Sequence, residues 1–143
     1  MDISNRKVSG KQVKDFYGKT VEAERRKRIK DPDGYGKRTG VCGDTVEIFI
    51  TTDNNRIDKI FFETNGCFNT SACANTIGCL AEGKAITDAW DITPDHIINY
   101  LQSLPSEEIH CAELVAGTFY LALSDYMHNQ RSPWKKIYQT QNI

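Results

Sequence analysis

Alternating apolar and polar residues predict a β-hairpin in the first half of the chain. Within Thr45–Thr52, the apolar residues Val46, Ile48 and Ile50 stand at every second position. This is the period-two pattern of a half-buried strand. The aspartate and two asparagines at 53–55 favour a turn, because their side chains bond to the nearby backbone. A second strand rich in isoleucine and phenylalanine is expected at Ile57–Thr64. The stretch Tyr35–Val41 is expected to add a third strand at the edge.

The second half of the chain has helical periodicity. A helix is expected after Gly66, ending near Gly83, with a short helical piece at 86–90. Thr93-Pro94-Asp95 has the cap, the first-turn proline and the acidic residue of a helix start. The last helix is marked by a stripe at helical spacing: Cys111, Leu114, Val115, Thr118, Phe119, Ala122 and Tyr126. Strands followed by helices predict an α+β fold, with a small antiparallel sheet of about three strands, helices packed on one face and a long C-terminal helix.

A charged stretch precedes the predicted strands. Glu22–Lys30 carries five basic and two acidic residues and is expected to continue a helix begun near Lys11, exposing a solvated face. A docking patch for an acidic partner is the alternative interpretation. The loop-forming stretch Asp31–Gly36 is expected to end this helix.

Length and charge narrow the class of protein. With 143 residues and 16.2 kDa, we expect a single domain spanning 1–143, with 1–12 and 130–143 as peripheral tails. A net charge of -1 argues against a nucleic-acid partner. The lack of a run of about 20 apolar residues argues against a membrane span. The N-terminus lacks the apolar core of a secretory signal, so we expect a cytoplasmic protein.

The cysteines carry the chemistry. The chain has five cysteines, and an odd number cannot all be paired in disulfides. In a reducing compartment, thiols favour metal or catalytic roles. Three thiols, one carboxylate and one imidazole lie where predicted elements begin or end: Cys42, Asp44, Cys67, His110 and Cys111. Thiolates select zinc, copper(I) or iron-sulfur clusters. The residues alone therefore predict a soft-metal site with four ligands drawn from these five, or, alternatively, separate buried cysteines.

The helix positions of these residues affect their expected chemistry. Cys67 and Cys111 are expected near helix N-termini, whose partial positive charge lowers the pKa of a thiol. Adjacent helical residues point about 100° apart, so we expect His110 to be poorly placed to activate Cys111. The other cysteines and histidines are interpreted as structural or surface residues: Cys73 and Cys79 pack, and His96 and His128 are exposed.

Three motifs in order, Cys42-Gly43-Asp44, Gly66-Cys67 and His110-Cys111, resemble those of the U-type iron-sulfur cluster assembly scaffolds, the IscU and NifU N-terminal family. The flanking sequences agree as well, and the resemblance extends over Val13–Tyr126. It fits the IscU/NifU branch better than the SufU relatives, which have an insertion before the third cysteine and lack the His-Cys pair.

The resemblance implies a carrier and not an enzyme. Such a scaffold accepts sulfur from a cysteine desulfurase and iron from an iron donor, builds a [2Fe-2S] cluster and passes it to apo iron-sulfur acceptor proteins. By position, the implied ligands are Cys42, Cys67 and Cys111, with Asp44 or His110 as the fourth, and the three cysteines are the candidate sulfur acceptors. A homodimer is left open.

The chain departs from the family pattern beside the third cysteine. Where members served by the specialised Hsp70 chaperone have Leu-Pro-Pro-Val-Lys, this chain has Leu104–Glu108, and its Glu108 reverses the charge of the lysine. Recognition by that chaperone is therefore not expected. Phe68 and Cys73 occupy positions that are small in the family, and the family's Asn-Pro-Arg-Asn is absent.

Three other functions remain as alternatives. A structural or regulatory zinc protein could use the same cysteine, aspartate and histidine residues, and zinc could also occupy the purified scaffold. A cysteine enzyme with His110 as its base is disfavoured by the helix geometry. A nucleic-acid module at Arg25–Lys30 is disfavoured by the near-neutral charge and the absence of clustered aromatic residues there.

Overall fold

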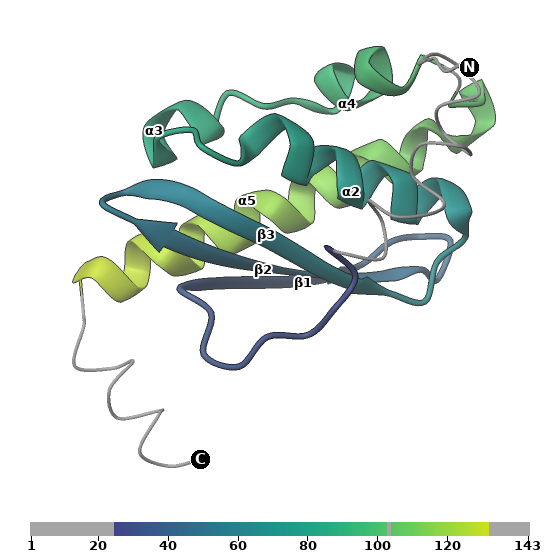
Figure 1. The fold of residues 1–143 in the computed structure, drawn as a ribbon. Coiled ribbons are helices and arrows are strands. Elements are labelled where there is room, and N and C mark those ends of the chain that lie inside the picture. The colour runs from purple at the N-terminus through teal and green to yellow at the C-terminus, as the bar shows by residue number, and fades with distance from the viewer. Residues whose placement is uncertain (1–24, 103, 132–143) are drawn as a thin grey trace.

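A three-stranded antiparallel sheet forms the base of the fold (Figure 1). The structure is a computed structural model that describes residues 25–102 and 104–131. Strands β1 (Gly34–Thr39), β2 (Thr45–Asp53) and β3 (Arg56–Thr64) lie in the order of the chain, each antiparallel to the next. The predicted hairpin and the edge strand are confirmed.

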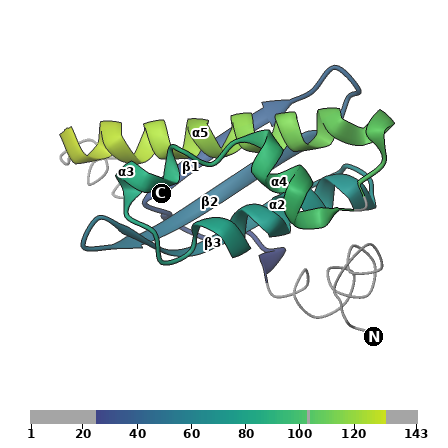
Figure 2. The ribbon, with the colours of Figure 1, turned by 90° about the horizontal axis from the view of Figure 1, so that it is seen from above.

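The helices cover one face of this sheet. Helix α2 (Phe68–Ala81) lies over β3, and the long α5 (Ile109–Arg131) lies beside it over β1 and β2 (Figures 1 and 2). Helix α4 (Pro94–Leu101) packs against both, while α3 (Ile86–Ala89) and the 3₁₀ turn η2 (Ser106–Glu108) complete the connections. The predicted α+β fold class is confirmed.

The helix boundaries follow the sequence signals closely. The Thr93 side chain accepts a hydrogen bond from the His96 backbone, and the His96 ring accepts one from the Thr93 backbone, which closes a capping box at the start of α4. His96 is thus an exposed capping residue. Gln130 and Arg131, the first residues of the expected C-terminal tail, continue α5. None of the helices within the described residues is both long and apolar enough to span a membrane.

The core lies between the inner face of the sheet and the helices. The alternating isoleucines of β2 are fully buried, as the period-two pattern predicts, and they meet Phe62, Ile77 and Phe119 in one cluster. Cys73 is fully buried within this cluster, as predicted. Cys79 differs from the prediction of simple packing, because it is half-buried and accepts a hydrogen bond from Arg25 at 3.7 Å.

The expected helix over Glu22–Lys30 is wrong for 26–30, which is not helical; its part before Arg25 lies outside the described residues. Arg26 instead forms an isolated parallel β-bridge with Phe62 at the open edge of β3. Its guanidinium group donates a hydrogen bond to the Thr64 carbonyl oxygen at 2.7 Å. Lys27 and Arg28 lie over the rings of Phe61 and Phe49 on the outer face of the sheet. The basic side chains therefore cover aromatic residues that the helices leave uncovered, a tertiary requirement that overrides the local helical pattern.

Helix α5 approaches β1 closely enough to require glycine in the strand. A Cβ atom at Gly36 would lie 2.4 Å from the carbonyl oxygen of Thr118 and 2.7 Å from the backbone nitrogen of Ala122. A Cβ atom at Gly34 would meet the carbonyl oxygen of Ala122 at 2.5 Å. Backbone atoms of a packed helix cannot move aside locally, so these two glycines set the distance between α5 and the sheet.

We expect Gly36→Ala to lower the free energy of unfolding by about 2–3 kcal/mol, the cost of overpacking a tight contact, as measured by urea denaturation. Gly40→Ala is the matched control, because the added methyl would meet side-chain atoms and no helix backbone: the tip of Leu114 at 3.2 Å and Cys42 Sγ at 3.7 Å. Its cost should stay below about 1 kcal/mol. Equal stabilities of the two variants would contradict the close approach of α5 to β1.

Candidate metal centre

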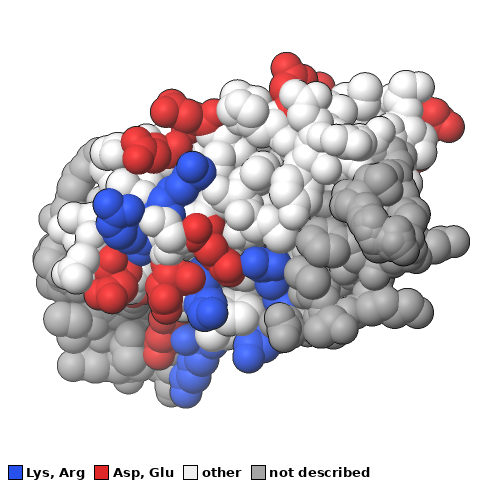
Figure 3. All heavy atoms as spheres, turned by 45° about the horizontal axis from the view of Figure 1, so that its top comes forward, with Lys and Arg blue, Asp and Glu red and all other residues white. Residues whose placement is uncertain are grey.

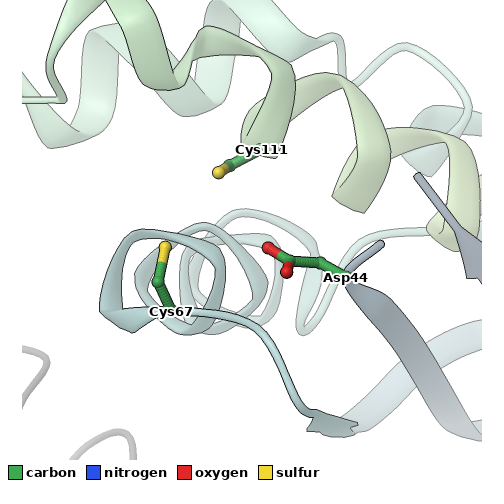
Figure 4. A group of neighbouring side chains, drawn as sticks. All are labelled: Asp44, Cys67 and Cys111. Carbon is green, nitrogen blue, oxygen red and sulfur yellow. The ribbon is translucent and has the colours of Figure 1, made fainter. Parts of the chain in front are cut away.

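Three chain segments meet at one end of the sheet, and each brings one metal-ligating side chain. Asp44 directly precedes β2, Cys67 is the N-cap residue of α2, and Cys111 lies in the first turn of α5. A carboxylate oxygen of Asp44 and the two sulfur atoms all lie within 4.8 Å of one another (Figure 4). The three side chains point into a common space, so two soft donors and one hard donor converge from distant parts of the sequence.

A buried hydroxyl group joins these three side chains. Thr70 is fully buried, and its Oγ1 lies 3.1 Å from Asp44 Oδ2, 3.3 Å from Cys111 Sγ and 3.8 Å from Cys67 Sγ. Its single proton can be donated to only one of these acceptors at a time. Thr70 therefore orients the ligands without being one. This role of Thr70 was not predicted from the sequence, although its position three residues after Cys67 places it on the same face of α2.

A second carboxylate lies beside the thiols. Glu108 Oε1 is 3.4 Å from Cys111 Sγ and 4.0 Å from Cys67 Sγ. Glu108, His110 and Cys111 form a second group whose ligand atoms all lie within 4.8 Å of one another. From the sequence, Glu108 was interpreted only as a reversed charge, although its place three residues before Cys111, about one helical turn, indicates that the two side chains can meet.

His110 contacts the thiol that it was expected to miss. Its Nε2 lies 3.7 Å from Cys111 Sγ, so the prediction that adjacent helical residues would diverge is wrong here. His110 is thereby available either as a metal ligand or as a hydrogen-bond partner of the sulfur.

Cys42 stands apart from both groups. It is exposed in the turn between β1 and β2, next to the fully exposed Val41, and belongs to neither cluster of ligand atoms. Together with His110 it lines a surface pocket between this turn and α5. The structure thus brings Asp44, Cys67 and Cys111 together, places His110 beside Cys111, and leaves the Cys42 thiol on the rim.

Burial dominates the electrostatics of Cys111. The pKa of this thiol is raised to about 12, chiefly by burial; the Glu108 carboxyl group also raises the pKa, and the Thr70 hydrogen bond lowers it. The prediction that the helix N-terminus would make Cys111 a thiolate is therefore wrong for the metal-free protein, because desolvation outweighs the helix field. A metal ion that binds this sulfur must displace the proton.

Comparison with known proteins identifies the family of the chain. The family model for the NifU-like N terminal domain matches residues 17–133. Two Archaeoglobus fulgidus proteins named iron-sulfur cluster assembly scaffold protein IscU 1 and IscU 2 are each 38% identical over 100 residues, which is 69% of this chain and 65% of each relative. The chain thus spans slightly less than two thirds of their length. An IscU scaffold protein of Aquifex aeolicus is 30% identical over 105 residues, covering 71% of this chain and 67% of the relative.

Solved structures share the fold. A NifU-like N-terminal structure from Brucella abortus superposes with a TM-score of 0.66 at 13% identity, covering 82% of this chain and 93% of that one. A SUF-system structure from Fervidobacterium islandicum gives a TM-score of 0.62 at 20% identity, covering 78% of this chain and 93% of that one. With the family model matching most of the chain, and relatives at 30–38% identity, the chain belongs to the family of NifU-like N-terminal domains.

Proposed function

We propose that this protein is a scaffold on which a [2Fe-2S] cluster is assembled from iron and desulfurase-derived sulfur and then transferred to apo-proteins. The observation that carries the proposal is the convergence of Asp44, Cys67 and Cys111 at one end of the sheet. Thiolates suit the iron of such a cluster, and the relatives named as IscU scaffolds support the assignment. Iron and sulfide are the substrates of this site.

The exposed position of Cys42 suits sulfur acceptance. In the proposed step its thiolate attacks the outer sulfur of a desulfurase persulfide, forming a persulfide on Cys42 and releasing the desulfurase thiolate. Cys67 is also exposed and is a second acceptor candidate, whereas Cys111 is buried. Reduction of the persulfide to sulfide takes two electrons from a separate donor. The proposed partners are therefore a cysteine desulfurase, an iron donor, a reductant and apo iron-sulfur proteins.

Holding zinc is the second candidate function. Zinc accepts mixed cysteine, histidine and carboxylate sets, and the donors around Cys111 offer each of these types. A zinc-loaded protein is colourless, whereas a [2Fe-2S] protein absorbs in the visible range, so metal analysis with a spectrum separates the two. An enzyme that uses Cys111 as nucleophile is less well supported, because burial raises the pKa of that thiol.

The charge distribution gives no support to a nucleic-acid function. On the face shown in Figure 3, basic and acidic side chains of the described residues are interspersed, without an extended basic patch. Arg25 pairs with Glu82 at 2.8 Å and Arg28 with Glu47 at 2.6 Å, so these two arginines of the basic stretch are engaged within the fold.

The first test replaces the three cysteines of the motifs one at a time. We expect Cys42→Ser, Cys67→Ser and Cys111→Ser each to lose most of the iron and sulfide bound after anaerobic reconstitution with iron, cysteine and a desulfurase, because a hydroxyl is a poor ligand for a cluster. Cys73→Ala is the control: it removes a buried thiol of the core and should keep its cluster. Unchanged cluster content in all three serine variants would rule out the proposed ligands.

The second test concerns release of the cluster. Asp44 supplies a hard oxygen among soft donors, which a recipient's thiolate displaces readily. We expect Asp44→Ala to hold its cluster longer in air and to transfer it to an apo-ferredoxin on the order of tenfold more slowly, the effect of about 1.4 kcal/mol on a barrier. Asp53→Ala, an exposed aspartate at the far end of β2, should transfer at the wild-type rate. Wild-type kinetics in Asp44→Ala would exclude control of release by this carboxylate.

The third test concerns the hydroxyl group that orients the ligands. Thr70→Val keeps the side-chain shape but removes the donor to Asp44 and Cys111. We expect a loss of about 1–2 kcal/mol in the free energy of unfolding and a roughly tenfold weaker affinity for Zn²⁺. Thr118→Val is the control, since Thr118 is equally buried but bonds only to a helix carbonyl oxygen. Zn²⁺ affinities that fall equally in the two variants would show that Thr70 acts through stability alone.

A further inference from the structure

The Glu108 carboxylate lies against both sulfur atoms of the site. Its Oε1 atom is 3.4 Å from Cys111 Sγ and 4.0 Å from Cys67 Sγ. In a tetrahedral site with metal–sulfur bonds of about 2.3 Å and metal–oxygen bonds of about 2.0 Å, neighbouring donor atoms lie about 3.3–3.8 Å apart. The separation from Glu108 to Cys111 Sγ falls within this range, and the separation to Cys67 Sγ is slightly longer.

The local backbone directs Glu108 into the site. It ends the turn η2, where its backbone nitrogen bonds to the Pro105 carbonyl oxygen at 2.9 Å, and α5 begins at the next residue. The spacing of one helical turn between Glu108 and Cys111 then brings both side chains to the same face. The neighbouring Glu107 is exposed and accepts a hydrogen bond from the Ser106 hydroxyl, at 3.5 Å. Two adjacent glutamates therefore have different surroundings, and only Glu108 contacts the thiols.

Charge also favours a cation at this point. A metal-binding cysteine is a thiolate, so Glu108 beside the bound forms of Cys67 and Cys111 brings three anionic donors together. Anions this close repel one another strongly in a partly buried site unless a cation lies between them. A carboxylate at 108 without a ligand role would weaken the metal site that it borders.

We propose that Glu108 is a ligand of the metal ion held by Cys67 and Cys111, an assignment that rests on the metal-binding role proposed above. Asp44 is grouped with the same two sulfurs but not with Glu108, so the assigned ligands are Cys67, Cys111 and Glu108, with Asp44 as the candidate fourth ligand. Cys42 is not needed in this set. Hard oxygen donors favour a divalent metal ion over a cluster bound only by thiolates. The site of this chain is therefore suited to hold a single divalent ion while the Cys42 thiol stays free.

Cobalt(II) is the probe, because its near-ultraviolet thiolate-to-cobalt bands report thiolate ligation and its visible ligand-field bands report coordination geometry. Apo-protein is titrated anaerobically with Co²⁺ for the wild type, Glu108→Gln, Glu108→Asp and the matched control Glu107→Gln. The glutamine keeps the size of the side chain and removes its charge, whereas the aspartate keeps the charge and withdraws the oxygen. Thermal melting of each apo-protein checks that it is folded.

We expect both Glu108 variants to change the ligand-field bands and to keep the thiolate-to-cobalt bands, with Co²⁺ affinity lowered by about tenfold or more in Glu108→Gln. Glu107→Gln should match the wild type. Wild-type ligand-field bands in both folded Glu108 variants would overturn the assignment, even with weaker affinity, since a mere charge effect leaves the geometry unchanged. A wild type without any thiolate-to-cobalt band would refute the metal site itself and, with it, the role of Glu108.

Discussion

The close packing of α5 on β1 determines where the site can form. Glycine at 34 and 36 lets the helix backbone approach the strand, and any side chain there would push α5 away from the sheet. The N-terminal turn of α5 thereby reaches the end of the sheet at which β2 begins and α2 follows β3. Cys111 meets Asp44 and Cys67 because of this packing, since the three residues are far apart in the sequence and share no local structure.

Hydrogen bonds at this end of the fold then orient the side chains that can bind a metal. Thr70 is buried beneath Asp44, Cys67 and Cys111, so their orientation is supported from below by a group with no exposure to solvent. Burial keeps Cys111 protonated without metal, while Cys67 and Cys42 remain exposed. The site thus combines a buried sulfur that ionises when it binds a metal with exposed sulfurs that a partner can reach. Both properties suit the proposed role of a scaffold that binds and later releases a cluster.

Much of the fold was predictable because its signals are local. Alternation along β2, the capping residues at Thr93 and the long stripe of α5 each depend on neighbours within a few residues, and the structure confirms all three. The non-helical course of 26–30 was not predictable in this way. It follows from the need to cover Phe49 and Phe61, which lie on the outer face of the folded sheet.

The candidate site was likewise predictable only in part. Element ends in the sequence pointed to five candidate ligands, of which the structure brings Asp44, Cys67 and Cys111 together. The roles of Thr70 and Glu108 depend on how α2 and η2 turn their side chains toward the thiols. The raised pKa of Cys111 depends on burial by the whole fold, which outweighs the helix field that a sequence reveals. The separation of Cys42 from the other donors likewise results from the exposed turn that carries it.

The most direct measurement of the scaffold role is a transfer experiment on the wild-type protein. The chain is loaded anaerobically with iron and desulfurase-derived sulfide, its iron and acid-labile sulfide are determined, and it is mixed with an apo-ferredoxin while circular dichroism in the visible range follows both proteins. The scaffold account predicts equal amounts of iron and sulfide, the spectrum of a [2Fe-2S] cluster, and movement of that spectrum to the ferredoxin. A colourless protein that retains zinc, or a cluster that never leaves the chain, would contradict it.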